Sequence, residues 1–233
     1  MQEIFEKYIE NSFDSHQQAN FKFHQFELNY KKFFKKGVSL NTLDIGVGRG
    51  EMLSCMKKWG YNYHGIDISP STVEFCKKLD LSCELVDDTE FWLNDHQKQF
   101  DIITCLDVLE HIPKDQLIRF LKGIFNSLKN GGIVIFQVPN LQSPFGYLHH
   151  FNDITHINGF VEHSLNQVLL SAGFKNTSCY GFEELYEKTP KVVTKKILRF
   201  FFRKIVRLLR TINANPNPEI LDPVFFTVAN REG

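Results

Sequence analysis

The chain of 233 residues lacks the marks of a disulfide-stapled secreted protein and of a structural zinc site. Its five cysteines are an odd number, and no two of them form a C-x-x-C pair. That usage favours reduced thiols in the cytoplasm. The acidic start MQEIFEKYIENSF does not resemble a signal peptide, and no apolar run approaches the about 18 residues of a membrane-spanning helix. We therefore expect a cytoplasmic protein, with contact to the inner face of a membrane left open.

The sequence also lacks net charge, because 27 basic residues balance 27 acidic ones. The balance is uneven along the chain. Eight Lys and Arg residues and no Asp or Glu fall between Lys191 and Pro218, which leaves 19 basic and 27 acidic residues elsewhere, a net charge of −8. Any cationic partner surface is therefore expected to be confined to this segment.

Strand-like and helix-like segments alternate from Asn41 to Asn140, and this alternation predicts the fold class. Five apolar runs read as strands: NTLDI, YHGIDI, SCELV, FDIITCL and IVIFQVP. Helical patterns separate them, the last one being PKDQLIRFLKGIFNSLKNGG, which we expect glycine to close. A further helix, EHSLNQVLLSAGF, and two late strands, NTSCYGF and PVFFTVAN, follow. The pattern predicts an α/β, Rossmann-like, seven-stranded, mostly parallel sheet with helices on both faces.

Three further segments frame this predicted domain of residues 37–233. Residues 1–36 form an N-terminal helical segment with Phe, Tyr and Leu at helix-like spacing. Residues 140–162 form a long polar segment with few apolar positions in phase. Residues 187–219 are an insert carrying a basic amphipathic helix before the last strand.

Three glycines, Gly46, Gly48 and Gly50, occupy the turn after the first predicted strand. Glycine permits positive φ and close approach of a ligand to the backbone, at the edge where α/β sheets bind ligands. The spacing is G-x-G-x-G, so the dinucleotide fingerprint G-x-G-x-x-G is absent. Asp44 precedes the turn and would repel a pyrophosphate, but it suits a ligand with an amino group.

Two more acids follow the next strands. Asp67 ends the second strand, where a carboxylate can accept both hydroxyls of a ribose. Asp88 follows the third strand within reach of an adenine edge, and its neighbour Asp87 is an alternative for that role. Adenosine joined to an amino acid, without phosphate, describes S-adenosylmethionine.

Five stretches carry a family resemblance: LDIGVGRGE, GIDIS, VDDTEF, FDIITCLDVLEHIP and LKNGGIVIFQVPN. In order and spacing they resemble the successive motifs of class I S-adenosylmethionine-dependent methyltransferases, over about residues 38–180. The resemblance implies that Asp44 and the glycine turn hold the methionine end and that Leu106 with Asp107 lies beside the sulfonium. The implied cofactor-binding residues are Asp44, Gly46, Gly48, Gly50, Asp67, Ile68, Asp88, Thr89, Leu106 and Asp107.

Nucleic acid is disfavoured as the methyl acceptor. Methyltransferases acting on the exocyclic amines of nucleic acids carry an Asn/Asp-Pro-Pro-aromatic stretch after the fourth strand, where this chain reads LDVLEHIP. The Pro-Cys nucleophile of enzymes that methylate pyrimidine carbons is also missing. We expect a small-molecule or glycan acceptor instead.

The loop after the fifth strand suggests a sugar. Its D-x-T-H, S-L and A-G-F elements resemble methyltransferases of bacterial capsule and surface-polysaccharide gene clusters, which implies O-methylation of a sugar or nucleotide sugar. Because histidine titrates near neutrality, we expect His156 to be the general base, with Asp153 orienting it or the substrate. Residues expected to contact the acceptor are His111, His149, His150 and Asn140.

Two alternatives stay open. The LDVLEH stretch also resembles quinone-pathway O-methyltransferases, whose acid-x-x-Glu-His stretch can carry a divalent cation, here on Asp107, Glu110 and His111. The favoured interpretation is that Glu110 and His111 line the pocket or cap the next helix, without a metal. The second alternative is a non-catalytic module that binds the cofactor and docks partners or a membrane.

The segment KKILRFFFRKIVRLLR separates into two faces on a helical wheel. The apolar face contains Ile197, Leu198, Phe201, Phe202, Ile205, Leu208, Leu209 and Ile212. The basic face contains Lys195, Lys196, Arg199, Arg203, Arg207 and Arg210. This pattern over residues 191–212 is typical of a peripheral membrane helix, and packing on its own domain or in a homodimer is the alternative.

Overall fold

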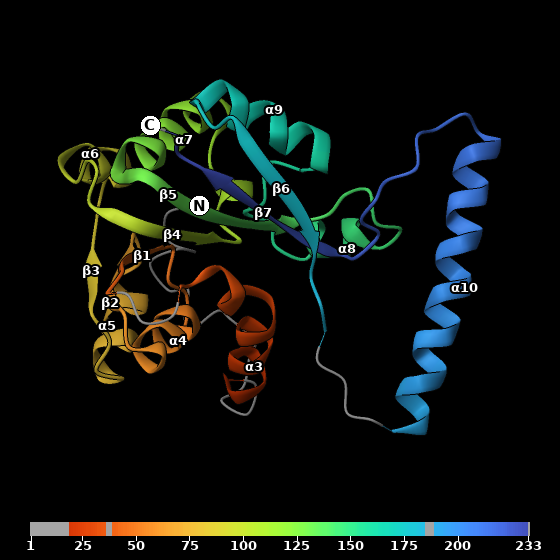
Figure 1. The fold of residues 1–233 in the computed structure, drawn as a ribbon, viewed down its shortest axis with the longest axis horizontal. Helices are drawn as coiled ribbons and strands as arrows, with labels where there is room; N and C mark the ends of the chain where they lie inside the picture. Colours follow the sequence, from red (N-terminus) through yellow and green to blue (C-terminus); the bar gives the residue numbers. More distant parts are fainter. Residues whose placement is uncertain (1–18, 36–38, 185–188, 233) are drawn as a thin grey trace.

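The structure is a computed structural model that describes residues 19–35, 39–184 and 189–232 (Figure 1). The N-terminal helical segment predicted over residues 1–36 is therefore described in part. It contains helix α3 (Ala19–Tyr30) and a 3₁₀ turn, η2 (Lys31–Phe33), and its other residues lie outside the described ranges.

A seven-stranded sheet of strand order β3-β2-β1-β4-β5-β7-β6 forms the centre of the fold. Strands β1 to β5 run parallel, and β7 is antiparallel to both of its neighbours. The predicted seven-stranded, mostly parallel sheet is thus confirmed. The strands are β1 (Asn41–Ile45), β2 (Asn62–Asp67), β3 (Cys83–Leu85), β4 (Phe100–Leu106), β5 (Leu128–Pro139), β6 (Asn176–Gly181) and β7 (Val224–Asn230).

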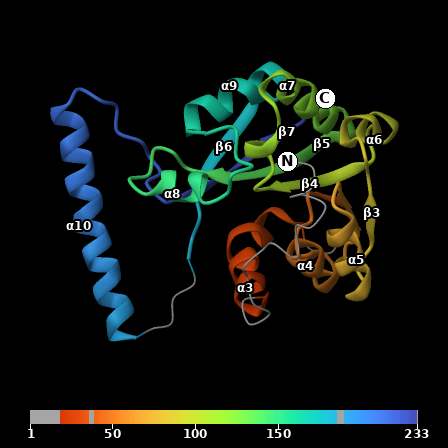
Figure 2. The ribbon, with the colours of Figure 1, turned by 180° about the vertical axis from the view of Figure 1, so that it is seen from behind.

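Helices cover both faces of the sheet, as predicted (Figures 1 and 2). One face carries α3, α4 (Glu51–Trp59) and α5 (Pro70–Lys78), and the other carries α6 (Thr89–Asp95), α7 (Lys114–Ser127) and α9 (Glu162–Ala172). Local chemistry fixes their starts. In α5, for example, the Ser69 hydroxyl accepts from the Thr72 N–H, and Pro70 supplies a helical φ at the first position. Separate hydrophobic clusters fill the two layers.

The helix predicted to continue to Gly132 ends at Ser127 instead. Leu128 is fully buried and pairs with Phe100 of β4 in extended conformation, so β5 begins five residues earlier than the sequence suggested. The burial gained by Leu128 on the sheet outweighs the helical preference of the residues before the glycines.

The carboxyl ends of β1, β2, β4 and β5 meet at one edge of the sheet, and two further elements are attached there. Helix α8 (Gly146–Phe151), inside the segment expected to be polar and irregular, follows β5. Helix α10 (Pro190–Ile212) is the predicted basic helix, and it connects the end of β6 to the start of β7. Because Gly181 pairs with Phe225 and Pro139 with Val224, both connections of α10 leave from this same edge. In the described ranges, no helix combines the length and apolar character needed to cross a membrane.

Candidate functional site

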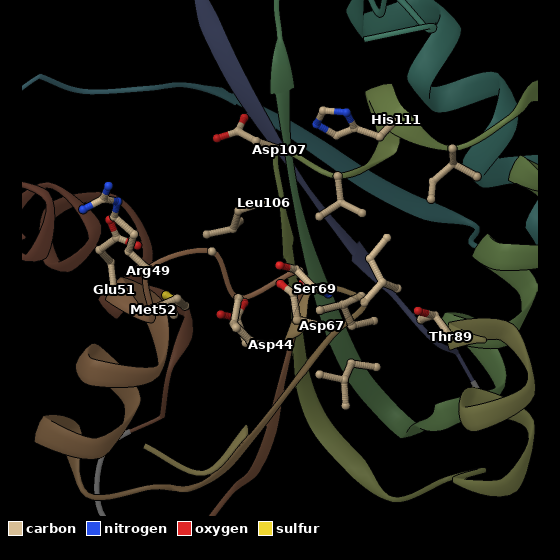
Figure 3. A pocket seen from close by; sticks show the side chains of 18 of the residues that line it. Asp44, Arg49, Glu51, Met52, Asp67, Ser69, Thr89, Leu106, Asp107 and His111 are labelled. Carbon is tan, nitrogen blue, oxygen red and sulfur yellow. The ribbon is translucent and has the colours of Figure 1, made fainter. Parts of the chain in front are cut away.

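A cavity of about 410 Å³ lies at this edge of the sheet (Figure 3). Its volume falls in the range of small-molecule sites, which is about 300–1,000 Å³. Asp44 and Asp67 lie near the ends of β1 and β2, whereas Asp107 and His111 follow β4. We call these the cofactor end and the acceptor end of the cavity.

The three predicted glycines have positive φ, at 73° for Gly46, 52° for Gly48 and 72° for Gly50. Two of them are also required by packing. A Cβ on Gly46 would lie 2.4 Å from Cγ2 of Val108, and one on Gly50 would lie 2.6 Å from Cδ1 of Leu81. Gly48 has no atom within 4 Å of such a position and lines the cavity, so it leaves bare backbone for a ligand.

Two buried carboxyl groups set the electrostatics of the cofactor end. Burial raises the pKa of Asp44 to about 8, although its Oδ1 accepts a 2.6 Å hydrogen bond from Thr104 that lowers it. Burial also raises the pKa of Asp67 to about 6, against backbone N–H groups that stabilise its ionised form, including that of Ser69. A cationic ligand would relieve this cost, so the cofactor end fits the ammonium and sulfonium of S-adenosylmethionine.

The residues predicted to flank the adenine separate in the structure. Ile68 and Thr89 line the cavity. Asp88 is exposed outside its lining and caps α6, where its Oδ1 accepts from the Phe91 N–H at 2.9 Å. Asp87, the alternative, is exposed outside the lining as well.

At the acceptor end, His111 belongs to the short 3₁₀ turn η3 (Leu109–His111) and lines the cavity. Its Nδ1 lies 2.8 Å from the Thr155 hydroxyl, which donates to Oδ1 of Asp153 at 2.6 Å. Burial, helped by neighbouring His156, lowers the pKa of His111 to about 4, against the charge of Asp153. His111 is thus a neutral imidazole coupled through one hydroxyl to a carboxylate.

His156, the predicted base, lies behind His111 and does not line the cavity. The two rings are edge to face with centroids 4.6 Å apart. The Nδ1 of His156 donates to the carbonyl of His150 at 2.9 Å, and its Nε2 lies 3.8 Å from Oε1 of Glu110. The structure therefore joins Asp153 to the ring of His111 rather than directly to that of His156.

Glu110 is fully buried, and among the described residues neither of its carboxylate oxygens has a hydrogen-bond partner. Burial, together with the charge of Asp107, raises its pKa well above the ordinary value. Glu110, His111 and His156 each present a ligand atom within 4.8 Å of the others, and the two neutral rings suit a divalent cation. This set differs from the predicted Asp107, Glu110 and His111, because Asp107 is not part of it.

The remaining predicted acceptor-binding residues lie away from the cavity lining. Asn140 is buried, and its side chain joins two loops by donating to the carbonyls of Ile220 and Asp222 and accepting from the Gln142 N–H. His149 is exposed on α8 and His150 is half-buried, and neither lines the cavity.

Helix α3 contributes residues that the sequence did not point to. Lys22 and Phe26 line the cavity, and Lys22 pairs with Glu51 at 3.2 Å. The buried Tyr30 hydroxyl donates to Oε1 of Gln137, whose Nε2 donates to Asp107 at 2.7 Å. The helical spacing of the aromatic residues was the available signal, but it does not say which of them faces a cavity.

Comparison with known proteins agrees with this geometry. A family model described as "Methyltransferase domain" matches residues 15–179. Curated relatives named "Ubiquinone biosynthesis O-methyltransferase" include one from Coxiella burnetii, 31% identical over 120 residues (47% of this chain, 49% of the relative). One from Shewanella sp. is 29% identical over 104 residues (42% and 43%). The chain thus spans about half the length of these relatives.

Among solved structures, a SAM-dependent methyltransferase from Archaeoglobus fulgidus aligns with a TM-score of 0.71 and 22% identity, covering 97% of this chain and 98% of that one. A SAM-dependent methyltransferase from Thermotoga maritima, described as a possible histamine N-methyltransferase, aligns with a TM-score of 0.67 and 17% identity over 99% of both chains. The fold expected from the motifs is confirmed. The chain belongs to the methyltransferase domain family and has the fold of S-adenosylmethionine-dependent methyltransferases.

Proposed function

We propose that this protein uses S-adenosylmethionine to methylate a phenolic or quinol hydroxyl of a small aromatic molecule. The observation that carries the proposal is His111, a neutral imidazole on the cavity wall that is linked through Thr155 to the Asp153 carboxylate. The names of the curated relatives, which refer to O-methylation in ubiquinone biosynthesis, support the same acceptor class.

The cofactor end provides the contacts for S-adenosylmethionine. Gly48 leaves the backbone bare, Asp44 would hold the amino-acid end, and Asp67 with Ile68 would hold the ribose, since all of them line the cavity. When bound, S-adenosylmethionine supplies a methyl group activated by its sulfonium. The work left to the protein is to position the acceptor and to remove its proton.

His111 performs that proton transfer in our proposal. It takes the hydroxyl proton as the acceptor oxygen is methylated, and the Asp153 charge with the backbone of Thr155 and Asp107 stabilises the protonated ring. An imidazole with a pKa of about 4 is a weak base. It matches a phenol, whose pKa is about 10, better than an aliphatic sugar hydroxyl, which is much less acidic.

The wall near His111 also favours an aromatic acceptor. Val108, Ile112 and Pro113, close to His111 in the chain, line the cavity with apolar side chains. Phe120 and, from α3, Phe26 also line the cavity. Such a surface binds a flat apolar ring by burial, whereas a sugar needs several hydrogen-bonding groups. The sugar acceptor inferred from the sequence rested on the resemblance of the D-x-T-H, S-L and A-G-F elements to methyltransferases of capsule gene clusters, and no name among the relatives above refers to a sugar.

A turnover screen with labelled S-adenosylmethionine tests the proposal. The probes are 3,4-dihydroxybenzoate, as a soluble catechol, and a set of nucleotide sugars. We expect methylation of the catechol that is lost in His111→Ala and retained in His163→Ala, a matched exposed histidine on α9. Methylation of nucleotide sugars alone would overturn the phenolic acceptor.

Two further measurements address the alternatives. Calorimetry with S-adenosylhomocysteine is expected to show binding, and its absence would favour a non-catalytic module. Because Glu110, His111 and His156 could hold a divalent cation, turnover is also compared with EDTA and with added Mg²⁺, Mn²⁺ or Zn²⁺. Equal rates in all conditions would exclude a metal-dependent reaction and support His111 as the base.

A further inference from the structure

Helix α10 turns its arginines toward its own protein. Arg199 pairs with Glu184 at 3.0 Å, and Arg203 forms an ion pair with Asp222. Arg207 donates to the Glu219 carbonyl at 3.2 Å, and Arg210 donates to the Pro216 carbonyl at 2.9 Å. These partners lie in the two segments that join α10 to β6 and β7. Four of the eight basic residues of α10 therefore hold the helix against these segments.

The apolar face consequently points to solvent. No residue of α10 is buried, and the helix stands apart from the sheet in both views (Figures 1 and 2). Exposure along this face ranges from 40% at Phe202 to 69% at Ile212. The alternative of packing on its own domain is therefore not realised within the described residues. A face of this size left open to water is a mark of an interaction surface.

This face continues onto α8. The ring of Phe145, which is 51% exposed, stacks on that of Phe202 with centroids 5.8 Å apart and planes at 16°. From there exposed apolar side chains extend along the helix to Phe151, which is 77% exposed. We call the combined area the α8–α10 surface. It lies on the side of the molecule where the carboxyl edge of the sheet opens.

Positive charge borders this surface. Lys191, Lys195 and Lys204 are exposed beside the apolar residues of α10, and the helix contains no acid. Since the rest of the chain carries a net charge of −8, an anionic partner is attracted to this side and repelled by the others. An apolar stripe bordered by lysines matches the boundary between acyl chains and anionic headgroups.

We propose that the α8–α10 surface docks flat on an anionic membrane. A second copy of the chain is a poorer occupant, because pairing two α10 helices through this face would bring their lysine borders together with no acid on either helix to neutralise them. Docking would turn the carboxyl edge of the sheet, and with it the cavity region, toward the bilayer.

Vesicle co-sedimentation of the full chain tests the proposal. The probes are vesicles of phosphatidylcholine with phosphatidylglycerol and vesicles of phosphatidylcholine alone. The test variant is Phe201→Ser with Leu208→Ser, at positions 59% and 60% exposed. The matched control is Phe91→Ser with Leu170→Ser, at positions 67% and 56% exposed on α6 and α9.

We expect wild type and control to bind the anionic vesicles, and the test variant to bind them about tenfold or more weakly. Binding to phosphatidylcholine alone should also be about tenfold weaker than to the mixture. Equal sedimentation of wild type and test variant would overturn the proposal, as would no sedimentation of wild type. A wild-type dimer that the test variant converts to monomer, without vesicle binding, would assign the surface to a second copy. Unchanged affinity for S-adenosylhomocysteine verifies that the variant is folded, so the result does not depend on the proposed reaction.

Discussion

The two ends of the cavity are built in different ways. The cofactor end comes from one continuous stretch, Asp44 to Ser69, and it relies on bare backbone and buried carboxyl groups. The acceptor end assembles α3, η3 and the loop at Asp153 from distant parts of the chain, and it relies on side chains. Substitutions at the first should therefore affect folding and cofactor binding together. Substitutions of side chains on the cavity wall of the second, such as His111, should affect turnover and leave cofactor binding intact.

The largest effect is expected at the acceptor end, from His111→Ala. Loss of a general base lowers turnover by about 10²–10⁴-fold, and we expect S-adenosylhomocysteine to bind as before because the cofactor end is intact. Steady-state kinetics with 3,4-dihydroxybenzoate and calorimetry measure the two quantities. His156→Ala is the comparison, since it removes a ring behind His111 rather than one on the cavity wall. A larger loss in His156→Ala than in His111→Ala would return the role of base to His156.

The contrasting change at the cofactor end is Gly46→Ala. A left-handed φ costs a non-glycine residue about 1–2 kcal/mol, and overlap of the new Cβ with Val108 adds about 1–3 kcal/mol. Urea unfolding should show the sum, and calorimetry should show weaker binding of S-adenosylhomocysteine. Gly60→Ala is the control, because Gly60 has positive φ and open space around its Cβ position. Equal losses in the two variants would show that the contact with Val108 is unimportant.

A smaller effect is expected from Tyr30→Phe, which tests whether α3 supports the cavity. The change leaves the buried Oε1 of Gln137 without its donor, at a cost of about 1–3 kcal/mol in the free energy of unfolding. It also loosens the contact of Gln137 with Asp107, so affinity for S-adenosylhomocysteine should fall. Tyr61→Phe, which removes an exposed hydrogen bond to the Lys35 carbonyl, should change neither quantity measurably. An unchanged affinity in Tyr30→Phe would show that the hydrogen bond from Tyr30 to Gln137 does not support the site.

The smallest change we expect is the release of a proton on ligand binding, which depends on pH. Folded protein keeps the Asp44 proton up to about pH 8, whereas an unfolded Asp loses it at about 3.9. The contribution of Asp44 to stability is therefore fully present below about pH 4 and is lost as pH rises toward 8. Binding of a ligand with an ammonium group, which S-adenosylhomocysteine carries, should ionise Asp44 and release up to one proton between about pH 6 and 8. Calorimetry of S-adenosylhomocysteine in two buffers of different ionisation enthalpy measures this release, which Asp44→Asn should abolish.

The position of the cavity could be predicted from the sequence because Gly48, Asp44 and Asp67 each lie at or just after the end of a strand. All three line the cavity, and their contact with the cofactor stays a prediction. Asp88 was less predictable, since a carboxylate one residue before a helix can cap it as readily as bind a ligand.

The acceptor end could not be predicted in the same way, because its contacts join distant residues. The hydrogen bond between His111 and Thr155 spans 44 positions, and it decides which histidine is linked to Asp153. The orientation of α10 could not be predicted from the sequence either. A helical wheel separates two faces, but Glu184 and Asp222, outside the helix, determine that the arginines turn inward.

Both segments that join α10 to the sheet are held by buried asparagines of the domain. The Asn29 side chain of α3 bonds the N–H and carbonyl of Glu183 before α10, and Asn140 holds the carbonyls of Ile220 and Asp222 after it. A coupling between α10 and the cavity would follow this path and would be reciprocal. If vesicles tighten binding of S-adenosylhomocysteine by some factor, then the loaded protein must bind vesicles more tightly by the same factor. If the coupling exists, the supply of cofactor would set how long the protein stays at a membrane surface.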